Sequence, residues 1–204
     1  SGFLAGFTHE LGRGAFAATW QSDFSRDIER PRNNSRTVRF YYPFENSHRF
    51  TASYDISGVA GLEEMSFTGF FGTSDQRTDQ DRFQTATTGR SIERADVSAR
   101  DFQVKASGER LLGSVHSEFG IDVNGRFGLR ALDILESYAL SGSLLSGSSN
   151  ASIDDARRTD AGAFAQFDVP LGARARLAAG VRADRVTTRN SGGFFGDLAT
   201  ANTA

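Results

Sequence analysis

Apolar and polar residues alternate along much of this chain, most clearly over residues 159–187. In the second half of that stretch, alanine, leucine and valine at every other position oppose a series containing charged residues. The charged members of that series are Arg174, Arg176, Arg182 and Asp184. Because successive side chains of a strand point to opposite faces, this period of two predicts a strand with one apolar and one charged face. The first half repeats the pattern, and Pro170-Leu171-Gly172-Ala173 predicts a tight turn between two long strands.

The same alternation predicts six further strands, so we expect an all-β chain of about eight antiparallel strands. They cover residues 3–8, 16–24, 49–56, 65–72, 95–106 and 115–123. Within 95–106 the apolar positions change phase near Arg100-Asp101, which predicts a β-bulge. Between the strands, Leu129, Leu132, Leu135 or Glu136, and Ala139 are spaced like one face of a short helix.

The connections between these strands alternate in length. Short ones cover residues 11–14, 57–63, 107–113 and 170–173, and long ones cover 25–47, 75–92, 124–158 and 187 onward. Long strands with short turns at one end and long loops at the other are typical of an outer-membrane β-barrel, with periplasmic turns and extracellular loops. Strands of about 9–11 residues suffice to cross a bilayer. A soluble β-sandwich, whose strands also alternate, is the alternative interpretation.

Composition narrows the function classes. The formal net charge of −2 lacks the basic excess of nucleic-acid-binding proteins, so no nucleic-acid partner is expected. The absence of cysteine excludes disulfides and thiolate metal sites. The sequence contains no run of about 18 apolar residues, so no transmembrane helix is predicted. Its first residues also lack the basic segment followed by an apolar segment that is typical of a signal peptide. Catalytic and nucleotide-binding motifs are also missing, so we expect no enzyme and no cofactor.

In a membrane barrel, the charged face must line the interior. An arginine on the lipid face costs about 2–4 kcal/mol near the midplane, and several of them would not be tolerated there. We therefore expect the charged and amide side chains of the best-defined strands to line the lumen. The expected lumen-lining residues are Glu118, Asp122, Gln166, Arg174, Arg176, Arg182 and Asp184.

Two stretches resemble barrel hairpins of TonB-dependent outer-membrane receptors, 95–133 and 158–186. The second is the more telling. Members of that family commonly have a strand of the form glycine-aromatic-x-Gln-x-acidic, a short turn, and an apolar strand ending in Gly-x-Arg-x-Asp. The matching positions here are Gly162, Phe164, Gln166, Asp168, Gly180, Arg182 and Asp184.

The resemblance implies a fold, a location and a function. The family has a larger barrel of 22 strands with an N-terminal plug, so residues 1–204 are expected to be a partial barrel domain without plug, signal peptide or C-terminal strands. The implied partners are outer-membrane lipid, an iron–siderophore or haem ligand, and the inner-membrane TonB complex acting through the missing plug. The implied location is the outer membrane of a Gram-negative bacterium. A complete, autonomous eight-stranded barrel with a structural or adhesive role is the alternative.

An aromatic and basic cluster is the candidate ligand-binding site of this receptor segment. It comprises Arg36, Arg39, Tyr41, Tyr42, Phe44 and His48, which could form a cationic lip for an anionic iron chelate or haem. His48, expected at the base of a loop, is the candidate haem ligand; an ordinary polar residue of the wall or a loop is the alternative. The alternative is that these aromatics belong to the belt at the membrane interface. No metal-ligand spacing occurs: Asp75, Asp79 and Asp81 lack the order of a calcium loop and indicate a solvated loop instead.

Overall fold

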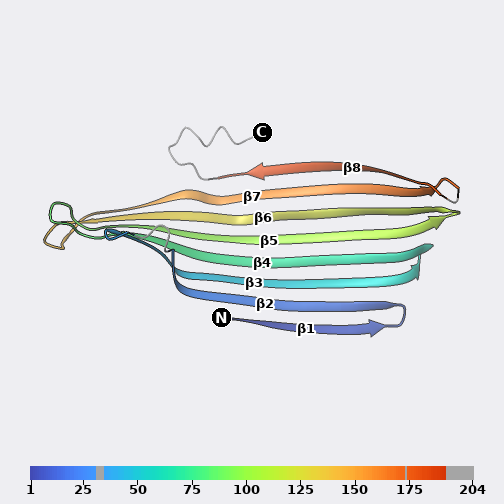
Figure 1. Cartoon of the computed structure of the whole chain (residues 1–204), viewed down its shortest axis with the longest axis horizontal. Coiled ribbons are helices and arrows are strands. Elements are labelled where there is room, and N and C mark those ends of the chain that lie inside the picture. The colour runs from blue at the N-terminus through green and yellow to red at the C-terminus, as the bar shows by residue number, and fades with distance from the viewer. Residues whose placement is uncertain (31–34, 173, 192–204) are drawn as a thin grey trace.

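A computed structural model of the chain describes residues 1–30, 35–172 and 174–191, and these form a single β-sheet (Figure 1). Its eight strands are β1 (Gly2–Leu11), β2 (Gly14–Glu29), β3 (Val38–Val59), β4 (Leu62–Arg82), β5 (Ser91–Leu112), β6 (Val115–Tyr138), β7 (Leu144–Pro170) and β8 (Arg176–Arg189). Every neighbouring pair is antiparallel, and the spatial order follows the sequence from β1 to β8. The prediction of eight antiparallel strands is therefore confirmed.

The sheet is open. Among the described residues, β1 and β8 each pair on one side only, and they form the opposite edges of the sheet in Figure 1. Two-residue turns at 12–13, 60–61 and 113–114 join strands at one end. The chain reverses at the other end through 30–37, 83–90 and 139–143.

Five strands, β3 to β7, extend well beyond their predicted ends, which corrects our loop boundaries. β3 begins at Val38, inside the loop expected at 25–47. β4 continues to Arg82, and most of the expected loop at 124–158 belongs to β6 and β7. The helical interpretation of Leu129, Leu132 and Ala139 is wrong, because β6 is extended from Val115 to Tyr138. The extra length was missed because polar residues on both faces hide the alternation of apolar residues on which a strand prediction depends.

The bulge predicted within 95–106 is wrong: β5 carries no extra residue, and a bulge lies instead on its neighbour β6, close to the predicted position. Ser98 pairs with Arg130 and Arg100 pairs with Phe127, so Ala99 faces both Gly128 and Leu129. Gly128 has a φ of 59°, which suits a residue without a side chain. β5 itself pairs with β4 without interruption, so the apolar positions of β5 do change from one face of the sheet to the other.

One face of the sheet carries exposed apolar side chains. Cross-strand pairing places them together, because directly opposite residues share a face. This apolar band includes Phe3, Phe7, Trp20, Phe50, Phe67, Phe71, Val104, Phe119, Ile121 and Val181, each at least 40% exposed.

The sheet has almost no hydrophobic core of its own. The buried apolar residues in the described part of the chain are Tyr42, Ala99 and Ala131. A soluble β-sandwich needs a second packed sheet, and the described residues form only one. The sandwich alternative is therefore excluded for this part of the chain. Within the same residues, no helix has the length and apolar character needed to span a bilayer.

Candidate functional site

The face opposite the apolar band is polar and hollowed; we call it the polar wall. Cross-strand neighbours on it include Gln21 with Arg49, Asp101 with Arg126, and Gln103 with Asn124. A hollow of about 780 Å³ is lined by these six residues together with Asp23, Arg158 and Asp160 among others. A second hollow of about 620 Å³ lies over Lys105, Glu118, Asp122, Gln166 and Arg182. The wall therefore offers both charge signs and amide groups along its length.

Three of the predicted lumen-lining residues form one ion-paired group on the polar wall. Arg182 on β8 lies 2.9 Å (Nη1 to Oδ2) from Asp122 on β6, and 2.7 Å (Nη2 to Oδ1) from Asp184 on its own strand. β7 runs between them, with Gly162 paired to both Asp122 and Asp184. A side chain at Gly162 would collide with the guanidinium of Arg182. The glycine thus leaves the space that the arginine needs to cross a strand.

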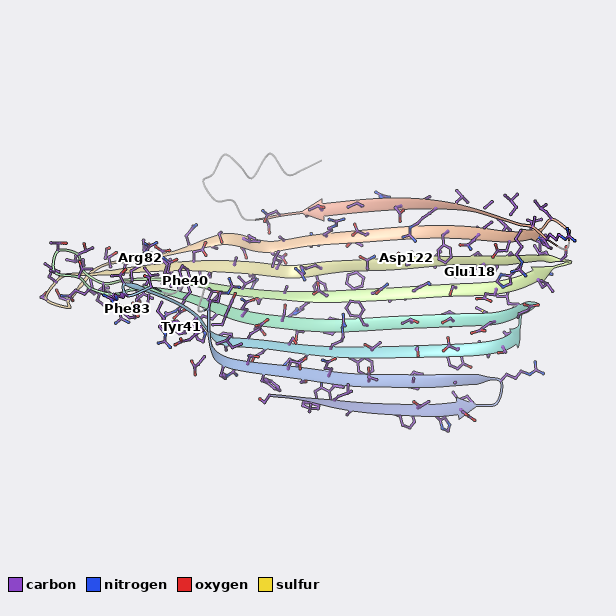
Figure 2. The ribbon with its side chains drawn as sticks, viewed as in Figure 1. Phe40, Tyr41, Arg82, Phe83, Glu118 and Asp122 are labelled. Atoms are coloured by element: carbon purple, nitrogen blue, oxygen red, sulfur yellow. The ribbon has the colours of Figure 1, made fainter. Side chains whose placement is uncertain are left out.

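The other predicted wall residues lie nearer the short turns. Glu118 pairs with Gln166, and Figure 2 places Glu118 and Asp122 along the same strand, β6. Arg176 is the first residue of β8 and pairs with Pro170. Arg174 lies in the connection 171–175, of which Ala173 is outside the described residues. Gly172 in that connection has a φ of 74°, as its place in the predicted tight turn requires.

The predicted aromatic and basic cluster lies at the N-terminal end of β3, away from the two-residue turns, and on the adjoining strands (Figure 2). Each of its aromatic rings has at least one arginine above it: Arg39 lies 4.7 Å from the centroid of Tyr41, Arg30 lies 4.4 Å from Tyr42, and Arg77 lies 5.3 Å from Phe44. Such cation–π contacts are attractive and leave part of the cation accessible. Arg26 also lies over the Phe44 ring, 5.7 Å from its centroid. We call these seven residues the arginine–aromatic rim: Arg26, Arg30, Arg39, Tyr41, Tyr42, Phe44 and Arg77.

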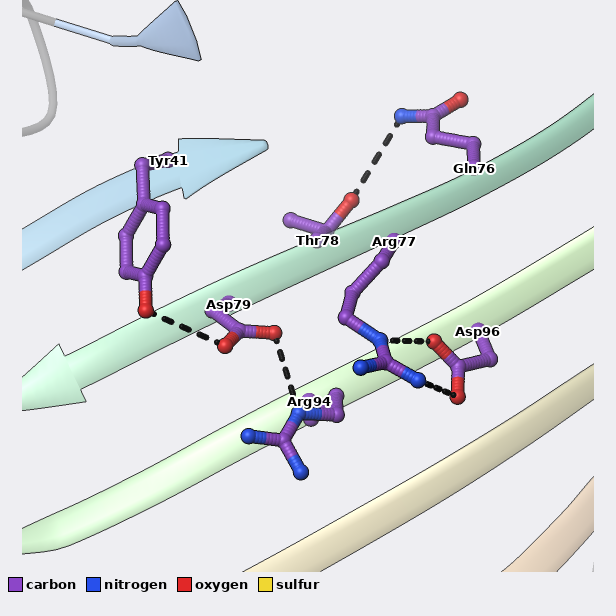
Figure 3. Close-up of polar contacts among 7 residues, drawn as sticks. All are labelled: Tyr41, Gln76, Arg77, Thr78, Asp79, Arg94 and Asp96. Atoms are coloured by element: carbon purple, nitrogen blue, oxygen red, sulfur yellow. Dashed lines mark hydrogen bonds and ion pairs between the residues drawn. The ribbon is translucent and has the colours of Figure 1, made fainter. Parts of the chain in front are cut away.

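Carboxylates hold the rim in place from the neighbouring strands (Figure 3). The Tyr41 hydroxyl donates to Asp79 at 3.2 Å, and Arg94 donates to the other Asp79 oxygen at 3.3 Å. Arg77 donates two hydrogen bonds to Asp96, at 2.5 and 2.8 Å. Asp79 is only 3% exposed, so both partners are needed to stabilise its charge. Burial, and then the Asp79 carboxylate, raise the pKa of Tyr41 above its ordinary value.

Two members of the predicted site lie apart from the rim. Arg36 is exposed in the connection 30–37, of which residues 31–34 are outside the described part. His48 lies within β3, not at a loop base, and contacts β2: its Nδ1 is 2.8 Å from the Ser22 hydroxyl and its ring meets Phe24 edge-on at 5.4 Å. Ligation of haem by His48 remains a prediction. In this structure the imidazole contacts the Ser22 hydroxyl on the neighbouring strand.

Sequence reasoning missed three arginines of the rim and two residues that support it. The missed rim members are Arg26, Arg30 and Arg77, and the supporting residues are Arg94 and Asp96. The prediction of a loop over residues 75–92 is wrong for its first part, because β4 continues to Arg82. A signal was present, because charges at 75, 77, 79 and 81 alternate with neutral polar residues at 76, 78 and 80. Charged residues therefore recur at every second position, which is the side-chain period of a strand and indicates that β4 continues through this segment.

No grouping typical of a metal site occurs among the described residues. Asp79 is ion-paired with Arg94, and Asp81 with Arg90. His116 is 3.1 Å from Glu109 on β5 (Nε2 to Oε2). The cation-rich rim and the mixed-charge wall are suited to binding polar or anionic solutes.

Comparisons with known proteins address the fold. No family model and no curated protein matches this chain. Among solved structures, the chain is similar to one described as "Copper transporter OprC", with a TM-score of 0.50 and 14% identity. The similarity covers 93% of this chain and 37% of the transporter, so the chain spans well under half of that protein's length. At this identity the likeness extends to the fold alone: the chain has the long antiparallel strands of a section of that transporter.

Proposed function

We propose that this chain is part of the wall of an outer-membrane transporter of the TonB-dependent type, which takes up a scarce nutrient complex. The observation that carries the proposal is the pair of opposite faces on one open sheet. An exposed apolar band suits contact with lipid, and a hollowed polar wall suits a water-filled or plugged lumen. The similarity in fold to a copper transporter supports this assignment.

The proposed location is the outer membrane of a Gram-negative bacterium. With the band in the bilayer, the two-residue turns face the periplasm and the arginine–aromatic rim projects outward. The open edges at β1 and β8 support a barrel completed by further strands, because unpaired edges invite pairing with other strands. A closed, autonomous eight-stranded barrel would instead pair β1 with β8.

The proposed ligand is a metal in an anionic or aromatic complex, such as a ferric siderophore or haem. Arginines beside aromatic rings bind anions through charge and flat ligands through stacking. The copper named for the structural neighbour is a further metal to test. Coupling to the inner membrane would act through a plug domain and the TonB complex, as the family resemblance implies.

Uptake by cells tests this proposal. The full-length protein carrying this chain would be produced in a Gram-negative host lacking its own receptors, with and without the TonB system. Radiolabelled ferric siderophores, haem and copper would be supplied separately at limiting concentration. We expect accumulation of one of them above the empty-vector level, abolished without TonB. Accumulation independent of TonB, or none above the vector level for any probe, contradicts the proposal.

Rim variants connect the uptake to the site. Replacing Arg39 or Tyr41 by alanine should raise the ligand concentration needed for half-maximal uptake, while Arg13→Gln at the opposite end of the sheet should not. Heat-dependent gel mobility of each purified variant verifies that its barrel is folded. Equal half-saturation concentrations for all of these folded proteins would remove the rim from the binding site.

A further inference from the structure

A pocket lies at the border between the apolar band and the charged outer part of the same face. Its volume is about 380 Å³, and its polar lining comes from four neighbouring strands, β4 to β7. The lining residues include Thr73, Asp75, Ser98, Arg100, Phe127, Arg130 and Asp155. Thr73 also borders the larger hollow of the polar wall, whereas the others line neither that hollow nor the rim.

Three phenylalanines fix the height of the pocket. The ring of Phe127 lies 6.3 Å from that of Phe71 and 6.0 Å from that of Phe102, and Phe71 pairs directly with Phe102. The next cross-strand pair on this face is Thr73 with Arg100, and beyond it the face carries charged residues. About ten residues separate Phe71 from the turn at 60–61, which is the length a strand needs to cross the bilayer. The pocket therefore lies at headgroup level on the outer side.

The bulge places a second arginine in this pocket. With regular pairing, Ser98 would face Leu129; because Gly128 and Leu129 together oppose Ala99, Ser98 faces Arg130 instead. Arg100 lies with its guanidinium 5.9 Å from the centroid of Phe127, at the upper edge of the aromatic cluster. Two arginines and the hydroxyls of Thr73 and Ser98 thus converge where the apolar surface ends.

Two carboxylates also line the pocket, so its charge is mixed. Asp75 pairs with Ser98 across the strands, and Asp155 comes from β7. Arg130 lies 3.6 Å from Asp154 (Nε to Oδ1), and both side chains are more than half exposed, so the pairing is weak. A ligand that fits must satisfy cationic and anionic groups at once, and must carry an apolar part to cover the band below.

We propose that this pocket binds the phosphate group of a membrane lipid in the outer leaflet. Arg100 and Arg130 hold the phosphate oxygens, with hydrogen bonds from Thr73 and Ser98. Asp75 and Asp155 take the ammonium of the same headgroup or a divalent cation that bridges to the phosphate. The acyl chains continue over Phe71 and Phe102 along the apolar band. The site depends on the membrane location proposed above, but not on any transported ligand.

Lipid retention by the purified full-length protein tests this inference. The probes are phosphatidylethanolamine and lipopolysaccharide in micelles of an uncharged detergent, each with and without magnesium, and inorganic phosphate alone. The test variant is R100Q/R130Q, and R13Q at the opposite end of the sheet is the matched control. We expect lipid phosphorus bound to the test variant to fall about tenfold relative to wild type and R13Q, since each charged hydrogen bond contributes substantially to affinity.

The outcomes separate this proposal from the proposed function. If wild type and R100Q/R130Q integrate into membranes equally well and retain equal amounts of lipid, the lipid site is wrong and the transporter remains. If inorganic phosphate displaces the lipid completely at equal phosphorus concentration, the site binds phosphate without regard to lipid, which also overturns the inference. If wild type fails to integrate into membranes, both proposals fail.

Discussion

Arg182 on β8 forms an ion pair with Asp122 on β6, although β7 lies between the two strands. The pair exists because position 162 on β7 is glycine, so the arginine can lie flat across the middle strand. It links three strands through side chains in addition to the backbone ladder. The glycine of the Gly-x-Phe-x-Gln pattern is therefore needed to leave space for the Arg182 side chain, which the sequence pattern alone does not reveal.

Replacing Gly162 by alanine should break this link. The new Cβ would lie within 2.5 Å of an Asp184 carboxylate oxygen and also against the Arg182 guanidinium. We expect this steric conflict and the loss of the ion pair to lower the urea midpoint of unfolding, measured by urea titration of the reconstituted protein. Arg182 is about half exposed, so the ion pair itself contributes little of this shift. The control is Gly6→Ala on β1, where the nearest atom is 3.6 Å away. Similar urea midpoints for the two variants would contradict this account.

Replacing Asp79 by asparagine should destabilise the rim. The neutral amide cannot balance the charge of Arg94, and it replaces a buried carboxylate that accepts from both Tyr41 and Arg94. We expect a cost of about 1–3 kcal/mol, seen as a lower temperature for loss of the folded gel band. Glu63→Gln, an exposed carboxylate near a two-residue turn, is the control. An unchanged transition temperature for the Asp79 variant would show that the network adds little.

The pKa of Tyr41 makes a prediction at alkaline pH. Burial and Asp79 raise this pKa above 10.0, so the fold favours the neutral phenol. Its contribution to stability is complete below pH 10.0 and is lost as the pH rises through the folded-state pKa. In Tyr41→Phe this particular loss should be absent, which a comparison of unfolding midpoints across that pH range measures. A difference absorbance spectrum placing the Tyr41 phenolate at or below pH 10.0 would reverse the sign of the effect.

Gly128 should resist substitution for conformational reasons. Nothing lies within 4 Å of a Cβ built there, but its φ of 59° disfavours any side chain. We expect Gly128→Ala to cost about 1–2 kcal/mol in the free energy of unfolding. Gly147→Ala, which is equally open and lacks a positive φ, should cost less. If urea titration gives the two variants equal stability, the bulge does not constrain this strand.

Two substitutions on β6 test which part of the sheet contacts lipid. Ile121 lies in the apolar band, whereas Leu132 lies on the same face in the outer part of the strand, opposite Asp96. Ile121→Arg should cost about 2–4 kcal/mol in a bilayer and much less in water. Leu132→Arg should have little effect. Equal yields of membrane-integrated protein for the two variants would contradict the assignment of the band to the lipid.

The fold was predictable wherever one face of a strand is apolar. The hairpin on either side of Pro170 is an example: alternation gave both strands, and Gly172 marked the turn. The outer half of β6 was not predictable in this way, because charged and apolar residues occur there on both faces. Leu129 and Leu132 then match a helical spacing by coincidence, and the pairing of β6 with β5 and β7 decides the conformation.

The candidate site was predictable only in its residue types. Arg39 and Tyr41 stand out in the sequence as a basic and an aromatic residue, but the loop expected at 25–47 hid the fact that they share one face of β3, where the arginine lies over the ring. The contact between Tyr41 and Asp79 joins residues 38 positions apart. It depends on the register of β3 against β4, which shifts between Tyr41 and Phe44. No local pattern of residues specifies such a shift.

The outward extension of the strands has a consequence for recognition. Tyr41 and Phe44 on β3 and Arg77 on β4 belong to backbone that is paired on both sides, so a solute arriving there meets these side chains at fixed spacing and height. Binding to such a surface avoids the entropic cost of ordering a flexible loop, a cost that lowers the affinity of loop-based binding sites. In the transporter proposed above, such a surface would hold a dilute solute before any part of the protein moves.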